Sequence, residues 1–219
     1  MRKQAADGSD VDGIALRRQI LPASFYARPA ELVAQSLLGK LLVHESPEGL
    51  CAGAIVETEA YLCCADGGCH AAGGMTPRNS VMWDAPGTIY VYVIHTHCML
   101  NVVTGATGLP EAVLIRAVEP TIGIELMRER RSRHRIVELT SGPGKLTQAL
   151  GITREHNRSM LDRAPLYATI NPEATERQIT VTTRIGLREG RGDDLMLRYL
   201  YADSEYISVK PKGVSRQAP

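Results

Sequence analysis

Two glutamates, Glu57 and Glu59, stand two positions apart in an apolar and β-branched stretch that predicts a strand over residues 55–61. Because side chains alternate along a strand, Glu57, Glu59 and Tyr61 should share one face. Acidic residues are poor strand formers, and a neighbouring negative charge raises the pKa of a carboxyl toward the range where it works as an acid or base. The pair therefore indicates either acid–base chemistry or an exposed edge strand with solvated glutamates.

The segments that follow carry further groups that could take part in chemistry. A polar, Gly-rich loop over residues 63–74 contains His70. Residues 88–94 and 98–104 predict the two strands of a hairpin, and residues 112–120 predict a further strand in which Arg116 lies among apolar neighbours. A buried arginine needs an anionic or acceptor partner, and Glu57, Glu59 or a ligand could supply it.

The remaining elements alternate irregularly, which argues against a doubly wound parallel sheet and favours an α+β fold. We expect a helix over residues 29–38, a second from Pro120 to about Arg133, and a third that begins after Ser141-Gly142 and ends at Gly151. A strand should begin at residues 41–44, late strands should occupy residues 179–185 and 195–199, and residues 206–209 should pair at an edge.

Six segments of the chain resemble, in the same order, the alkyladenine (3-methyladenine) DNA glycosylases, a family of monofunctional base-excision repair enzymes. They read IVETEAY, H…GG.TPRN, PGTIYVYVI, LNVV, VLIRAVEP and SGPGKLTQALGI, and the resemblance spans about residues 25–209. It implies one compact α+β domain around a curved, mainly antiparallel, open-barrel-like sheet flanked by helices. It also implies a protruding β-hairpin that inserts into the minor groove of DNA.

The resemblance assigns the chemistry to Glu59 and Arg116. Hydrolysis of an N-glycosidic bond passes through an oxocarbenium-like transition state, so the enzyme mainly needs an oriented water and a base. Glu59 matches the family's water-activating carboxylate, and Arg116 matches the arginine that helps to hold this water. Glu57 has no comparable role, and we expect it to stay ionised and structural, paired with Arg78 or Arg116.

The target nucleotide must leave the duplex, and glycosylases read it in a pocket by stacking. Tyr61, His70 and Tyr92 match the family's aromatic walls, and a positively charged purine between rings gains a cation–π interaction that a normal purine lacks. Asn101 matches the residue that crowds the exocyclic amino group of guanine. The main chain around Gly68, His70 and Ile185 matches positions that contact the base edge or the water.

The chain departs from the family at the tip of the hairpin. Many members place there a tyrosine that wedges into the gap left by the flipped base, whereas this chain has His95 and a tip one residue shorter. A histidine can fill such a gap, because intercalating wedges need bulk more than a particular chemistry. The alternative is that His95 and His97 are only polar turn residues.

The five cysteines raise the question of a metal site. Cys63, Cys64, Cys69 and His70 cluster, but zinc ligands usually come in pairs separated by two to four residues, with a second pair further along the chain. Adjacent cysteines do not easily reach one metal, and the family needs none. We expect no metal, no cofactor, and free thiols in a reducing compartment.

Length and composition set broader limits. At 219 residues, one domain over residues 19–210 is expected, with flexible tails at residues 1–18 and 211–219. The net charge of +1 does not by itself indicate a DNA-binding protein. No signal peptide or membrane span is visible, so we expect the protein in the bacterial cytoplasm or nucleoid, or in a eukaryotic nucleus. We also expect it to be a monomer.

Two rival functions fit part of the pattern. Sugar glycosidases also use paired carboxylates, but Glu57 and Glu59 would lie on the same side of a substrate, whereas acid and nucleophile must flank the scissile bond. A non-catalytic relative that binds damaged DNA would keep the pocket and lose excision. The presence of all the site residues argues against it, and the changed hairpin tip is the only feature that leaves it open; these residues are Glu59, Tyr61, His70, Tyr92, Asn101 and Arg116. The implied substrate is duplex DNA that carries 3-methyladenine, 7-methylguanine, hypoxanthine or ethenoadenine, without a ranking among them.

Overall fold

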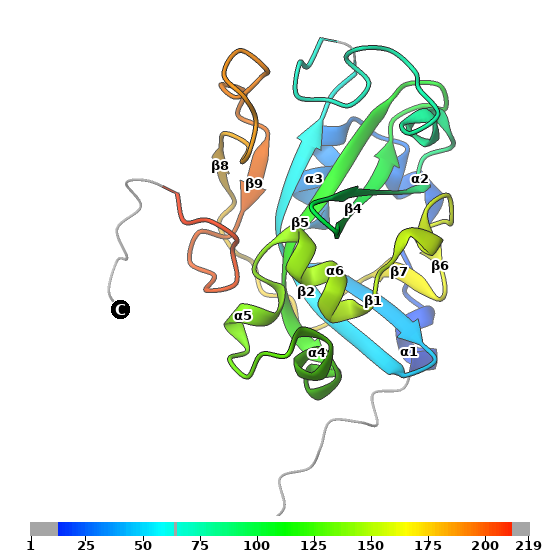
Figure 1. Ribbon diagram of the computed structural model, residues 1–219. Helices are drawn as coiled ribbons and strands as arrows, with labels where there is room; N and C mark the ends of the chain where they lie inside the picture. Colours follow the sequence, from blue (N-terminus) through cyan, green and yellow to red (C-terminus); the bar gives the residue numbers. More distant parts are fainter. Residues whose placement is uncertain (1–12, 64, 212–219) are drawn as a thin grey trace, which may run out of the picture.

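A computed structural model describes residues 13–63 and 65–211. Within these residues, nine strands form one curled antiparallel sheet (Figure 1). Its order is β3–β4–β5–β2–β1–β7–β6, and β9 pairs with both β2 and β8. The strands are β1 Leu41–Ser46, β2 Gly49–Tyr61, β3 Ile89–Ile94, β4 His97–Thr104, β5 Glu111–Ile122, β6 Asp162–Arg163, β7 Leu166–Thr169, β8 Thr180–Thr182 and β9 Arg198–Leu200.

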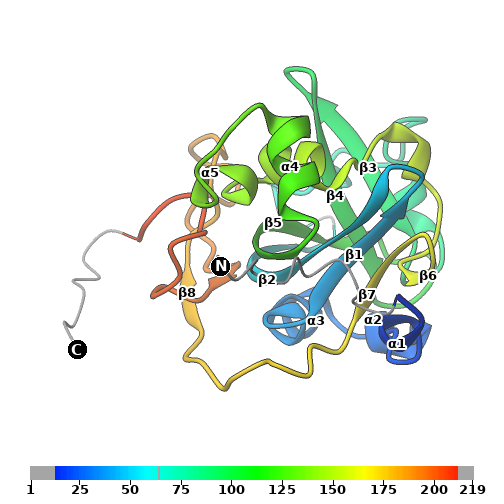
Figure 2. The same ribbon diagram turned by 90° about the horizontal axis from the view of Figure 1, so that it is seen from below.

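The α+β fold with a curled sheet flanked by helices is confirmed. In Figure 2, α1–α3 lie toward the lower edge of the view and α4 and α5 toward the upper edge, and buried residues of α3, α4 and α6 pack into one hydrophobic core. The helices are α1 Gly13–Arg17, α2 Ala23–Tyr26, α3 Ala30–Leu37, α4 Ile124–Arg131, α5 Val137–Thr140 and α6 Pro143–Leu150, with short 3₁₀ turns η1 Ser80–Trp83 and η2 Arg154–His156. In α3, Ala30, Val33, Ala34 and Leu37 recur at helical spacing, are all buried, and pack the helix onto β2 and β5.

Strand β2 is the central element of the sheet. It pairs with β5 along most of its length, with β1 along its first half and with β9 at residues 57–59. Both of its faces are covered, and Glu57 and Glu59 are each 0% exposed. The interpretation of residues 55–61 as an exposed edge strand is therefore wrong.

Several of the expected elements differ in the structure. Strand β5 continues through Pro120 to Ile122, and helix α4 begins only after Gly123, whose φ is 73°. Pro120 lies opposite Gly53 at a register shift, which is the kind of irregular position where a strand tolerates proline. Residues 206–209 form no strand, and β8 and β9 are shorter than the late strands that the sequence predicts.

The ends of the chain are described only in part. Helix α1, with Leu16 buried, lies inside the segment expected to be a tail. The rest of that tail, residues 1–12, lies outside the described residues, as do Cys64 and residues 212–219. No helix in the described part of the chain is long and apolar enough to cross a membrane.

Candidate active site

Irregularities in the pairing of β2 with β5 bring the charged residues of both strands together. The register shifts between Ile55 and Glu57 and again between Glu57 and Thr58, so Arg116 has no directly opposed partner residue. Such bulges bend a strand and re-aim its side chains. Arg116 consequently faces the same side as Glu57 and Glu59, while Thr58 points the other way and donates to the carbonyl of Ala34 in α3.

Glu59 is fully buried and tightly bound. Its Oε2 accepts hydrogen bonds from the Tyr61 hydroxyl at 2.8 Å and from Arg116 Nη1 at 3.1 Å. Its Oε1 accepts from the backbone N–H of Ile185 at 2.8 Å. A carboxylate has about four lone-pair sites, so Oε1 keeps one acceptor site for a further donor such as water.

Glu57 is occupied by a second set of partners. Its Oε1 accepts from Arg116 Nε at 3.1 Å, Arg198 Nε at 2.8 Å and the Ser208 hydroxyl at 2.7 Å, and its Oε2 accepts from the Ser208 N–H. The expected pairing of Glu57 with Arg116 is confirmed, and Arg78 takes no part. Burial opposes the charge of Arg116, but Glu59 and Glu57 raise its pKa above the usual value. Both carboxylates come from the same face of β2 and bind one guanidinium, which does not suit a sugar glycosidase, whose acid and nucleophile must flank the scissile bond.

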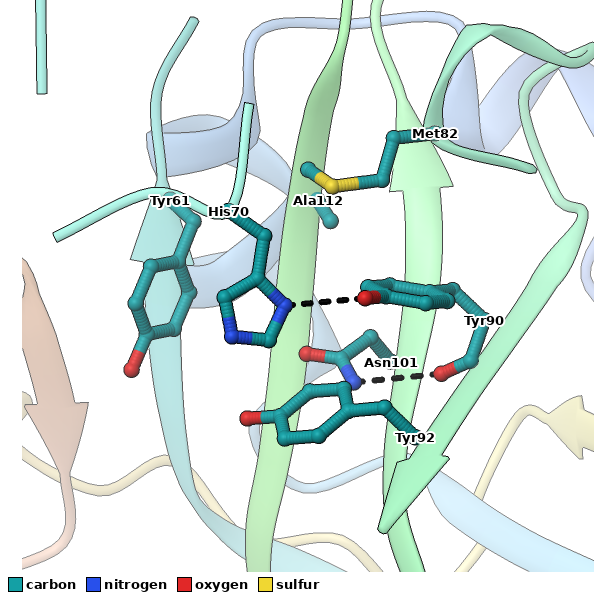
Figure 3. A pocket seen from close by; sticks show the side chains of 7 residues that line it. All are labelled: Tyr61, His70, Met82, Tyr90, Tyr92, Asn101 and Ala112. Carbon is teal, nitrogen blue, oxygen red and sulfur yellow. Dashed lines mark hydrogen bonds between the residues drawn. The ribbon is translucent and has the colours of Figure 1, made fainter. Parts of the chain in front are cut away.

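An aromatic cavity lies beside this charged cluster (Figure 3). The structure brings Tyr61, His70, Tyr92 and Asn101 together around it, together with three residues that the sequence analysis missed, Tyr90, Met82 and Ala112. Tyr61 connects the two regions, because its ring lines the cavity and its hydroxyl bonds to Glu59. The free space is about 20 Å³, which is room for roughly one water molecule.

The rings pack against one another at the centre of this cavity. His70 and Tyr92 meet edge to face with centroids 4.5 Å apart, and His70 Nδ1 lies 2.8 Å from the hydroxyl of Tyr90. Burial raises the pKa of Tyr90 and of Tyr92 to about 12, so both phenols stay neutral. The packing of its inner edge, together with the charge of Arg78, lowers the pKa of His70 below 6.5 and favours the neutral imidazole.

Hydrogen bonds hold two of the cavity residues in place. The Asn101 amide nitrogen donates to the carbonyls of Tyr90 and Met99, so its oxygen is the group left to face the cavity (Figure 3). The Asn79 amide nitrogen donates to the carbonyls of His70 and Gly74 at 2.8 and 3.0 Å. The TPRN segment therefore fixes the loop that carries His70.

Two of the residues predicted to contact the base or the DNA lie outside the cavity lining. The N–H of Ile185 binds Glu59, and the Ile185 side chain does not line the cavity. His95 is exposed in the two-residue turn between β3 and β4, where His95 and Thr96 have φ values of 45° and 75°. Such left-handed conformations cost about 1–3 kcal/mol for residues other than glycine and often mark functional positions.

The cysteines and histidines also raise the questions of a metal site and of a reactive thiol. Among residues 13–63 and 65–211, no group of three or more His, Cys, Asp or Glu side chains could hold a metal ion. Cys69 is buried, and burial raises the pKa of its thiol to about 12.

Comparisons with known proteins identify the family to which the chain is similar. The family model described as methylpurine-DNA glycosylase matches residues 24–205. A protein of Prosthecochloris aestuarii named "putative 3-methyladenine DNA glycosylase" is 47% identical over 186 residues, 84% of this chain and 88% of its own. Proteins with the same name from Methanoculleus marisnigri and Bacillus subtilis are 47% and 43% identical, and each match covers 86% of this chain and 98% or 96% of the relative.

Proposed function

Because the chain belongs to the methylpurine-DNA glycosylase family, we propose that it flips alkylated or deaminated purines out of duplex DNA and removes them with a water activated by Glu59. Membership in the family makes the protein a hydrolase of N-glycosyl bonds whose substrate is DNA. The observation that carries the finer proposal is the buried Glu59 carboxylate, which is bound on three sides and linked through Tyr61 to an aromatic cavity.

The proposed reaction uses the acceptor site that remains on Glu59. A water donates one proton to Oε1 of Glu59 while its oxygen attacks C1′ of the sugar, and the base leaves with the electrons of the N-glycosidic bond. Arg116 stabilises the carboxylate before the reaction and orients it through the 3.1 Å bond to Oε2. A cationic alkylated purine leaves as a neutral base, so it needs no acid, whereas a neutral lesion such as hypoxanthine must gain a proton.

Recognition of the base would rest on the rings around the cavity. A purine is much larger than the present free space, so Tyr61 must move apart from His70 and Tyr92 as the base enters. The base then stacks on Tyr61 from one side and on His70 and Tyr92 from the other. A cationic base gains about 0.5–2 kcal/mol from the ring faces, and Asn101 crowds the position where guanine carries its amino group.

We propose that His95 fills the gap left by the flipped nucleotide. His95 is exposed at the end of the β3–β4 hairpin, and its φ lies in the left-handed region. Turns of this kind favour Gly, Asn or Asp, so we expect a histidine at this position to have a function there. The imidazole of His95 is smaller than the phenol ring of a tyrosine, so it would stabilise the flipped nucleotide less. The protein would work as a monomer on chromosomal DNA, in a bacterial nucleoid or a eukaryotic nucleus.

Chromatographic analysis of the released bases tests this proposal. Duplexes that each carry one 3-methyladenine, 7-methylguanine, hypoxanthine or ethenoadenine would be incubated with the protein, and an undamaged duplex of the same sequence would serve as the control. We expect free damaged base and an intact abasic strand. Tight binding of the damaged duplexes without release of any base would instead show a lesion-binding protein.

A further inference from the structure

The wall residue Tyr61 is in contact with a cationic side chain. The guanidinium carbon of Arg184 lies 4.6 Å from the centroid of the Tyr61 ring. Arg184 is not among the residues that line the cavity. The side chain of Arg184 is 0% exposed.

The guanidinium is held in a site built around it. Its two terminal nitrogens each donate to one carboxylate oxygen of Asp66 at 2.5 Å, and they also donate to the carbonyls of Ala60 at 3.0 Å and Gly192 at 3.1 Å. Asp66 in turn accepts from the N–H groups of Leu62 and Gly68. These bonds fix the plane of the guanidinium against the ring.

Two glycines leave the space that this arrangement needs. A Cβ atom at Gly68 or at Gly192 would lie 2.9 Å from a terminal nitrogen of Arg184. Within residues 13–63 and 65–211, the Nε of Arg184 is buried without a hydrogen-bond partner. A buried ion pair is a costly way to join β2, the loop that follows it and the segment between β8 and β9, and well-packed apolar residues often do so as well or better. Stability alone therefore does not explain why a positive charge is held against the ring of Tyr61.

We propose that Arg184 is a positioning residue that sets the charge selectivity of the base pocket, by occupying the face of Tyr61 opposite the one on which a base stacks. This inference rests on the proposed function, in which a flipped purine stacks on Tyr61. A cation on one face of a ring draws its electron density outward and repels a second cation on the other face. Arg184 thus reduces what a cationic purine gains from Tyr61 and leaves a neutral purine nearly unaffected.

The consequence is a pocket that accepts neutral lesions alongside cationic ones. Without Arg184, stacking on Tyr61 would favour 7-methylguanine, which is cationic in DNA, over hypoxanthine, which is neutral. The selectivity is the ratio of the single-turnover rate constants for release of 7-methylguanine and of hypoxanthine. A cation–π interaction of the usual size corresponds to about a threefold to tenfold change in this ratio.

The test compares three variants with the parent. Asp66→Asn/Arg184→Gln removes both charges and keeps hydrogen-bonding groups, so it leaves no unpaired charge. Arg184→Lys keeps the positive charge. Asp203→Asn/Arg177→Gln is the matched control, because Arg177 also pairs with an aspartate, at 2.8 Å, and stacks on a tyrosine, Tyr201, at 4.4 Å, outside the base cavity.

We expect the ratio to rise about threefold to tenfold in Asp66→Asn/Arg184→Gln and to stay within about twofold of the parent in Arg184→Lys and in the control. An unchanged or lower ratio in folded Asp66→Asn/Arg184→Gln overturns the inference. If that variant does not fold, Arg184→Lys decides, and a several-fold rise in its ratio overturns the inference. Release of neither base by the parent would overturn the proposed function itself.

Discussion

Replacement of Glu57 by glutamine should lower the free energy of unfolding and change the rate of excision only slightly. In the parent, the two carboxylates of Glu57 and Glu59 balance the two guanidinium groups of Arg116 and Arg198, and all four side chains are at most 8% exposed. The substitution Glu57→Gln leaves one positive charge without a counter-charge in this buried cluster. It also removes an acceptor from the Ser208 N–H, so the segment around Ser208 loses its anchor on β2.

The size of the effect follows from these contacts. Loss of one partner of a buried ion pair costs about 3–5 kcal/mol, and the remaining amide oxygen, which can still accept one or two bonds, places Glu57→Gln near the lower end. For a chain of this size each kcal/mol lowers the melting temperature by about 2–4 °C, so a fall of about 6–12 °C is expected. Glu57 bonds neither to Tyr61 nor to Ile185, so the folded variant should excise bases within about tenfold of the parent rate.

Urea unfolding followed by circular dichroism gives the stability, and single-turnover release of hypoxanthine below the unfolding range gives the activity. Glu125→Gln is the control, because Glu125 is 75% exposed and its pair with Arg128 should contribute less than about 1 kcal/mol. A Glu57→Gln variant that is as stable as the parent but inactive would refute the structural role of Glu57. It would make Glu57 part of the chemistry.

Three further predictions concern the hairpin, the pocket and pH. His95→Tyr should lengthen the lifetime of the complex with damaged DNA and speed release, and unchanged dissociation and excision rates would remove His95 as the wedge. Asn101→Ser should raise release of guanine-type bases about tenfold, as measured against hypoxanthine, because the side chain that crowds the amino group becomes smaller. Burial lowers the pKa of His44 below 6.5, and burial together with the charge of Arg78 does the same for His70. The stability that these neutral imidazoles contribute is therefore complete above pH 6.5 and is lost as the pH falls through their pKa values in the folded protein. His44→Gln should therefore weaken the pH dependence of urea unfolding below pH 6.5, and an unchanged slope would contradict this.

The local pattern was sufficient to predict the charged strand. Alternation along residues 55–61 placed Glu57, Glu59 and Tyr61 on one face, and the bonds of Arg116 and Tyr61 confirm it. The need of a buried arginine for an acceptor predicted the pairing of Arg116. Both inferences use only neighbours in one strand or the cost of a buried charge, so one sequence is enough for them.

The other partners of Glu57 were beyond such reasoning. Arg198 and Ser208 come from 141 and 151 positions further along the chain, and nothing local in the sequence marks this distant pairing. Arg198 does stand among apolar residues in β9, the same signal that singled out Arg116. Pro120 misled in the opposite direction, because proline often opens a helix, and only the register shift beside Gly53 explains why it lies within a strand here.

The pocket was predicted in part. Tyr90 and Tyr92 stand two positions apart in β3, so strand alternation could have placed Tyr90 beside Tyr92 in the cavity. Met82 and Ala112 carry no such signal, because a small or flexible apolar residue looks the same in any core. The resemblance supplied the roles of His70 and Asn101, which come from a loop and from β4 and meet only in the folded protein.

The rate of base release by the parent and by Glu59→Gln, under single-turnover conditions, tests the central claim most directly. A duplex with one hypoxanthine would serve as substrate, and its binding to both proteins would be measured in parallel. We expect release by the parent and, in the variant, similar binding with release slowed by about 10²–10⁴-fold, because the water loses its base. Release by Glu59→Gln at the parent rate would contradict the assignment of Glu59.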